Sequence, residues 1–184
     1  ANPERRLHAV QVISVFASTA EQGDKMTAIF LPGVTAYMGT ASTHDARRWG
    51  VTAASQMAAH ADPLTLVEHP GLLKALVRLM LVGQDTAGDL LVALTEETCP
   101  ARAAGEQRGL RIALLNVFAM DKHPLHARNC AALTLANMYD TGDYDDRELI
   151  ATSPGVLRAI YDLSDYKAPG QFTEANGALR LARY

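Results

Sequence analysis

Apolar and polar residues alternate along the chain in blocks that occur four times. The clearest block, GLLKALVRLM at 71–80, is apolar except for Lys74 and Arg78, which lie four residues apart and share one edge of a helix. Similar blocks stand at 31–38, 107–118 and 153–163, each with a glycine near its start. The aligned glycines are Gly33, Gly71, Gly109 and Gly155. Their spacings of 38, 38 and 46 residues lie near the period of about 40–47 residues that is typical of helical solenoids.

Each block predicts three helices with a glycine corner between the first two. A short helix comes first, as at 24–30 and 63–69, and the glycine lets the next helix leave at a sharp angle. The apolar block forms this second, largely buried helix. A longer third helix is expected at 4–19, 44–60, 86–98, 126–140 and 172–184. Strand patterns and hairpin turns are nearly absent, so the sequence predicts an all-α protein.

This organisation resembles the armadillo repeat. GLLKALVRLM at 71–80 resembles the second helix of that family, and ARNCAALTLANMY at 127–139 resembles its third helix, with small residues and a late asparagine. The resemblance implies a right-handed α-solenoid of armadillo-like three-helix repeats. Residues 1–184 then form a single repeat domain of about four units, and its corners are expected near Gly33, Gly71, Gly109 and Gly155.

Two alternatives to this domain interpretation stay open. HEAT repeats follow the same packing physics as armadillo repeats, and the pattern is compatible with both. The chain also begins and ends inside third helices, so it is either a complete array or a segment of a longer solenoid. The third unit is the poorest match, because Arg108 stands where the other units have proline and Gly88 weakens its helix.

A stack of helical units presents an extended curved surface, which suits binding a protein or a peptide. In armadillo proteins the third helices line the concave groove, where Trp and Asn residues four positions apart hold extended peptides. Only Asn137 matches the asparagine column here, so recognition of basic import peptides is not expected. The resemblance instead implies a mixed groove for a partner helix or a folded surface. The candidate partner-binding residues are Gln11, Ser14, Gln56, His60, Thr134, Asn137, Arg180 and Arg183.

The function predicted from this pattern is a non-catalytic protein–protein interaction module. One alternative is a structural subunit or a fragment of a larger scaffold or chaperone, and another is a metal-dependent enzyme or regulator. Self-association through exposed ends of the solenoid is a further expectation. The only tryptophan, Trp49, aligns with Leu7 and Cys130 on apolar faces, so it is expected to pack inside the protein.

Composition narrows the classes of partner. With 48% hydrophobic and 20% charged residues, the chain is expected to fold, and its net charge of -3 does not favour nucleic-acid binding. The longest apolar run, at 72–82, is interrupted by two cations, so membrane insertion is not predicted. Cys99 and Cys130 form no CxxC pair, which favours a reducing intracellular, cytoplasmic location.

Two stretches of the sequence contain residue types that can bind metal ions. His123, His126 and Cys130 have a spacing that can gather metal ligands, but no fourth ligand is adjacent, so neither a metal site nor a cofactor is predicted. The acidic run at 140–148 lacks the EF-hand spacing and is expected to cap a helix that starts near Asp145. Phosphate-binding loops, nucleophile elbows and HExxH are absent, so enzymatic activity is not expected.

Overall fold

The computed structural model describes residues 2–18, 23–141, 147–164, 178 and 180–183 of the chain. The regular secondary structure of these residues is α-helical, and no strand occurs among them. The all-α prediction is therefore confirmed for this part of the chain. The helices are α1 (Pro3–Ala17), α2 (Gly23–Thr40), α3 (His44–Ala58), α4 (Pro63–Glu68), α5 (Leu72–Leu81), α6 (Asp85–Ala93), α7 (Thr98–Glu106), α8 (Arg108–Ala119), α9 (Leu125–Tyr139), α10 (Arg147–Thr152) and α11 (Val156–Ser164).

Two of the expected corners are sharp turns at glycine. Gly71 precedes α5 with a φ of 87°, and Gly155 precedes α11 with a φ of 79°. Glycine adopts this left-handed region without the steric cost that a Cβ brings. Between α7 and α8 the break falls at Gln107, and Gly109 itself lies in the first turn of α8.

Helix α2 corrects the prediction of a corner near Gly33, because it continues unbroken through Pro32. A proline inside a helix removes one backbone hydrogen bond and normally interrupts the helix. In α2 the side chains of Leu31, Val34 and Met38 are buried in the core. Pro32 and Gly33 lie on the exposed side of the same helix. We attribute the continuity of α2 to its buried apolar face, which offsets the missing hydrogen bond.

The third helix expected at 86–98 is shorter than predicted. Helix α6 ends at Ala93, and α7 begins at Thr98 with Pro100 in its first turn. Proline is tolerated in a first turn because the N–H groups there have no partner within the helix. A helix that continued through position 100 would lose a backbone hydrogen bond in its interior. The chain therefore turns before Pro100. The last predicted helix, at 172–184, lies mostly outside the described residues.

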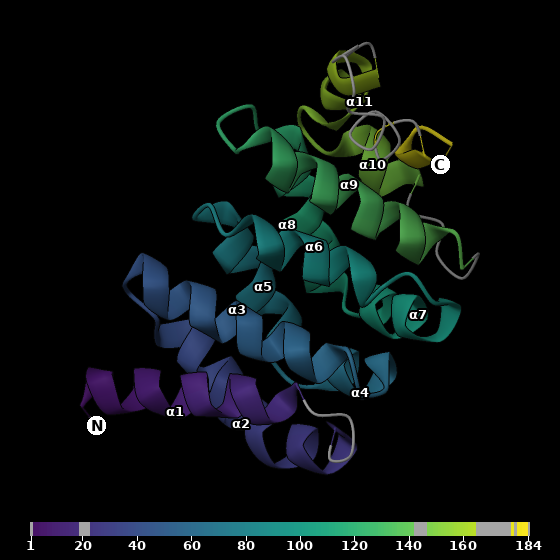
Figure 1. Ribbon diagram of the computed structural model, residues 1–184. Coiled ribbons are helices and arrows are strands. Elements are labelled where there is room, and N and C mark those ends of the chain that lie inside the picture. Colours follow the sequence, from purple (N-terminus) through teal and green to yellow (C-terminus); the bar gives the residue numbers. More distant parts are fainter. Residues whose placement is uncertain (1, 19–22, 142–146, 165–177, 179, 184) are drawn as a thin grey trace.

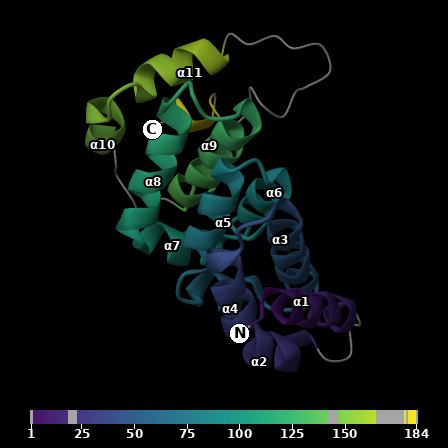
Figure 2. The same cartoon turned by 90° about the vertical axis from the view of Figure 1, so that its left-hand side faces the viewer.

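The helices pack in rows that follow their order in the chain. Helix α1 contacts α3, α3 contacts α6 and α6 contacts α9, so the helices that the sequence predicts as third helices lie side by side. Helices α2, α5, α8 and α11 form a second row in the same way, and α4 packs on α7. Figure 1 shows this order from the N-terminal end at the bottom to α11 at the top. Figure 2 shows α3 and α6 on one side of the stack and α4 and α7 on the other.

The second and third helices supply most of the core. In α5 the two cations, Lys74 and Arg78, are exposed, while its other residues up to Met80 are buried, as the sequence predicted. Helix α9 contacts α6, α7 and α8 and is buried along most of its length. Its alanines allow the neighbouring helices to approach closely. Trp49 packs against the core and is half-buried, which confirms its expected packing role.

Polar side chains connect positions that lie about one repeat apart. Six hydrogen bonds each join residues 39 to 42 positions apart in the sequence. This separation agrees with the glycine spacing of the sequence. The pairs are Arg78 with Gly39, Gln107 with Val67, His126 with Asp85, Cys130 with Asp89, Asn137 with Thr95, and Arg180 with Asp140.

Candidate functional site

The residues expected to bind a partner differ in how far solvent can reach them. Gln11, Gln56 and His60 are half-buried, and they lie on or directly after the third helices α1 and α3. Arg183 is exposed near the C-terminal end of the described chain. These four side chains can contact a partner without rearrangement of the fold. Asn137 and Arg180 are also half-buried, and both take part in bonds between units.

Ser14 and Thr134 correct the expectation that every predicted site residue lies at the surface. Ser14 is 5% exposed, and Thr134 is fully buried. The Thr134 hydroxyl donates a hydrogen bond of 2.8 Å to the Cys130 carbonyl, one turn earlier in α9. A short hydroxyl side chain inside a helix can form its hydrogen bond with the backbone of the same helix in this way. A partner therefore cannot reach Ser14 or Thr134 in this conformation.

Asn137 and Arg180 are brought together at the C-terminal end of α9. Both line a small polar hollow of about 90 Å³, together with Glu96 and Asp140. The Asn137 Nδ2 donates to the Thr95 Oγ1 at 3.3 Å, and the Arg180 guanidinium forms an ion pair with the Asp140 carboxylate. The two predicted residues thus connect α9 to the turn after α6 and to the C-terminal segment.

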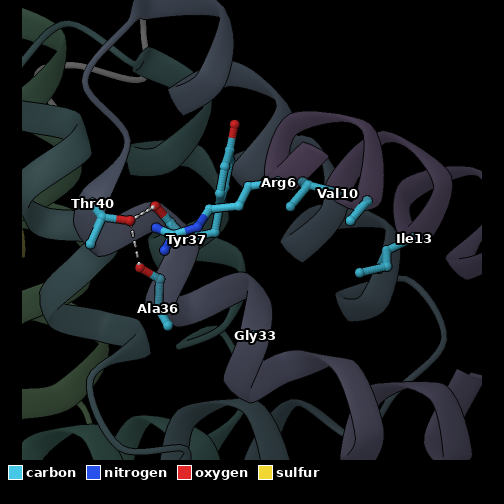
Figure 3. A pocket seen from close by; sticks show the side chains of 8 residues that line it. Arg6, Val10, Ile13, Gly33, Ala36, Tyr37 and Thr40 are labelled. Atoms are coloured by element: carbon cyan, nitrogen blue, oxygen red, sulfur yellow. Dashed lines mark hydrogen bonds between the residues drawn. The ribbon is translucent and has the colours of Figure 1, made fainter. Parts of the chain in front are cut away.

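The larger cavities lie at the N-terminal end of the stack, where sequence reasoning expected a glycine corner. One open cavity of about 340 Å³ lies between α1 and α2 and is lined mainly by apolar groups such as Val10 and Ile13, and also by Arg6 (Figure 3). A second, of about 300 Å³, extends from Tyr37 to the start of α3. Burial raises the pKa of the Tyr37 hydroxyl above its ordinary value.

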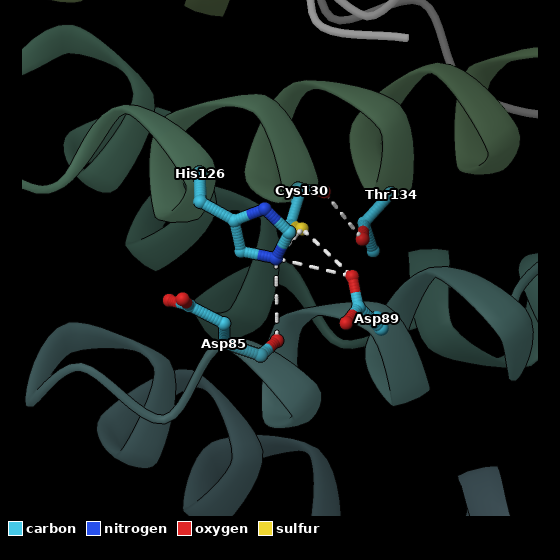
Figure 4. A network of polar contacts seen from close by, with 5 residues as sticks. All are labelled: Asp85, Asp89, His126, Cys130 and Thr134. Atoms are coloured by element: carbon cyan, nitrogen blue, oxygen red, sulfur yellow. Dashed lines mark hydrogen bonds and ion pairs between the residues drawn. The ribbon is translucent and has the colours of Figure 1, made fainter.

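A cluster of three chemically reactive side chains lies between α6 and α9 (Figure 4). His126 and Cys130 are one turn apart on α9 and face Asp89 on α6, and their ligand atoms all lie within 4.8 Å of one another. His126 Nε2 is 3.0 Å from Asp89 Oδ1, 3.3 Å from Cys130 Sγ and 3.3 Å from the Asp85 carbonyl oxygen. Sequence spacing placed the first two residues together, but it gave no indication of Asp89.

His123 lies apart from this cluster, before the start of α9. Burial, followed by the nearby charges of Lys122 and Arg128, lowers the pKa of His123 below its ordinary value. The Arg128 side chain is itself buried, and its Nε donates to the Phe118 carbonyl at 2.9 Å. His123 is therefore not one of the residues that the structure gathers in this cluster. The acidic run around Asp145 lies largely outside the described residues.

No protein-family model, no curated protein and no solved structure matches this chain. The resemblance to armadillo repeats therefore depends on the residue patterns. Within the described residues, every helix is too short or too polar to span a bilayer.

Proposed function

We propose that the chain is a right-handed α-solenoid of armadillo-like three-helix units, which acts as a non-catalytic protein–protein interaction module. The observation that carries this proposal is the row of third helices α1, α3, α6 and α9, in which successive helices contact one another. Hydrogen bonds across 39 to 42 residues repeat along the stack and support the same unit length. A stack in which each unit contacts its neighbours presents a long surface to a partner.

The partner surface in this proposal is the exposed side of α3, α6 and α9, which we call the third-helix face. Gln56 and Asn137 contribute half-buried amides, and Leu133 contributes a half-buried apolar side chain. Amides can both donate to and accept from a partner's backbone. Asp89 on α6 and Glu96, just after the end of that helix, add carboxylates, which favour a partner with basic side chains beside its apolar anchors. This surface suits one helix or one edge of a folded protein.

Site-specific photo-crosslinking in cells of the source organism tests the proposal. A photoreactive residue is placed at Gln56 or Glu96 on the third-helix face, and at Lys74 or Arg158 as controls on the second-helix row. All four positions are half-buried or exposed, so the replacements leave the core intact. We expect one discrete adduct of the same mass from positions 56 and 96, and none from positions 74 and 158. Adducts from the control positions alone would contradict the third-helix face.

A second candidate is a structural subunit that packs permanently against neighbours, and the ends of the stack favour it. Among the described residues, most of the exposed large apolar side chains lie at these ends, although Val82, Ile112 and Met120 are exposed in the middle of the stack. Val15 is 67% and Ile29 is 69% exposed on α1 and α2, and Leu157 is 58% exposed on α11. Sedimentation of the chain over a range of concentrations, beside a Val15→Glu variant, separates the two candidates. Association that the variant abolishes supports packing through the N-terminal end, and a monomer at all concentrations excludes it.

A further inference from the structure

The Asp89, His126 and Cys130 side chains form a three-donor cluster with one nitrogen, one sulfur and one carboxylate oxygen. His126 and Cys130 are separated by four residues, so both point from the same side of α9. Asp89 reaches the same point from α6 (Figure 4). The cluster lies at the edge of the protein, because the Asp89 side chain is 60% and the His126 side chain 35% exposed, while Cys130 is buried.

The contacts of His126 are not those of a catalytic triad. In such a triad the imidazole uses one ring nitrogen for the nucleophile and the other for the carboxylate. Here Cys130 Sγ and Asp89 Oδ1 both contact the same atom, Nε2. The thiol is also only 2% exposed, so a substrate cannot reach it. Nε2 carries at most one proton, which can be directed at one of the neighbouring lone-pair atoms.

A cation at the centre of the cluster would interact with all three donors at once. The donor–donor distances are 3.0 Å for N and O, 3.3 Å for S and N, and 4.0 Å for S and O. A tetrahedral Zn²⁺ with ordinary bond lengths holds N and O about 3.3 Å apart, and S about 3.5 Å from each of them. The cluster lies within about 0.5 Å of this geometry, which rotation of the exposed Asp89 side chain can correct.

We propose that Asp89, His126 and Cys130 bind a zinc ion, with water in the fourth position. A thiolate and an imidazole select zinc over calcium or magnesium, which prefer oxygen ligands. The thiolate and the carboxylate together carry two negative charges, which balance the charge of Zn²⁺. The bound ion joins the third helices of two successive units, α6 and α9, and stabilises their contact. This proposal does not depend on the proposed partner-binding function.

Gly88 leaves the space that the Cys130 thiol occupies in this site. A Cβ built at position 88 would lie 2.8 Å from Cys130 Sγ, closer than atoms can pack. The absence of a side chain at Gly88 therefore allows the Cys130 sulfur to lie directly against α6, beside Asp89. Gly88 lowers the helix propensity of α6, but the structure shows that a glycine is needed there for close packing of α6 against α9.

Cobalt titration of the full chain, after removal of metals with a chelator, tests the site. Co²⁺ replaces Zn²⁺ in tetrahedral sites and gives a thiolate-to-cobalt charge-transfer band together with intense visible bands. We expect the natural chain to bind one Co²⁺ with these bands, and Zn²⁺ to displace it. Cys130→Ser removes the charge-transfer band, and Asp89→Asn weakens binding at least about tenfold, because even partners of metal ligands contribute about 10–100-fold to affinity.

Two matched variants control for nonspecific binding. Cys99→Ser removes an exposed thiol outside the cluster, and Asp85→Asn removes a neighbouring carboxylate that points away from the cluster in Figure 4. Both are expected to bind Co²⁺ as the natural chain does. Circular dichroism of each variant checks that it is folded, and Asp89→Asn keeps the test valid if Cys130→Ser does not fold. A natural chain without the charge-transfer band, or a band that survives in Cys130→Ser and disappears in Cys99→Ser, overturns the proposal.

Discussion

Replacement of Gly88 by alanine tests the close contact between α6 and α9. The new Cβ would lie 2.8 Å from Cys130 Sγ and 3.0 Å from Cys130 Cβ. Optimal carbon–carbon contacts are about 3.5–4.0 Å. Rotation of the Cys130 side chain relieves the first contact but not the second, because the Cβ position is fixed by the backbone. The two helices must therefore separate.

The magnitude follows from two opposing effects. Alanine has a helix propensity about 1 kcal/mol better than that of glycine, which stabilises α6. Overpacking of a filled core costs about 1–3 kcal/mol. Two contacts at or below 3.0 Å, one of them to an atom that cannot rotate away, place the cost at the upper end of that range. We expect Gly88→Ala to lower the free energy of unfolding by about 1–2 kcal/mol.

Urea unfolding followed by circular dichroism measures this effect, with Gly33→Ala as a matched control. Gly33 also lies inside a helix, but a Cβ built there meets no atom within 4 Å. Gly33→Ala is expected to raise the free energy of unfolding by about 0.5–1 kcal/mol. If Gly88→Ala were as stabilising as Gly33→Ala, the helices would not approach as described, and the geometry of the metal cluster would be lost with them.

Three further changes probe other features. Pro32→Ala is expected to raise the free energy of unfolding by about 1–2 kcal/mol in a urea titration, since it restores a bond inside α2; no gain would show that α2 is interrupted there. Arg128→Leu should lower the free energy of unfolding by about 1.5–3 kcal/mol, because the Phe118 carbonyl loses its buried charged donor. Burial is the main cause of the lowered pKa values of His69 and His123. The unfolded state then binds protons more readily, so stability falls as pH drops below about 6.5, and replacing both histidines with glutamine should flatten this fall.

Helices with long periodic patterns could be predicted from the sequence. The expected helices at 44–60 and 126–140 agree with α3 and α9 to within two residues at each end. The continuation of α2 through Pro32 could not be predicted. Proline normally interrupts a helix, but burial of the apolar face of α2 offsets this effect, and that burial depends on the neighbouring helices. The end of α6 differs from the prediction for a similar local reason, because Pro100 lies in the first turn of a separate helix, α7.

Only those relations in the candidate site that lie within one helix could be predicted from the sequence. The spacing of His126 and Cys130 placed them on one side of a helix, whereas Asp89 faces them because of how α6 and α9 are aligned. That alignment depends on packing at Gly88, which one sequence does not reveal. The polarity of Thr134 predicts a surface position, yet its hydroxyl is satisfied inside α9. Polarity alone does not separate an exposed threonine from one bonded to its own helix.

The third-helix face is the surface proposed to bind a protein partner. Isothermal titration calorimetry of the crosslinked partner with the full chain tests it, using two double variants of matched charge change. Gln56→Arg with Glu96→Arg alters the third-helix face, and Lys74→Glu with Arg158→Gln alters the second-helix row by the same number of charges with the opposite sign. We predict a loss of affinity of at least about tenfold, which equals about 1.4 kcal/mol, for the first pair only. An equal loss for both pairs, or a loss for the second pair alone, would contradict binding at the third-helix face.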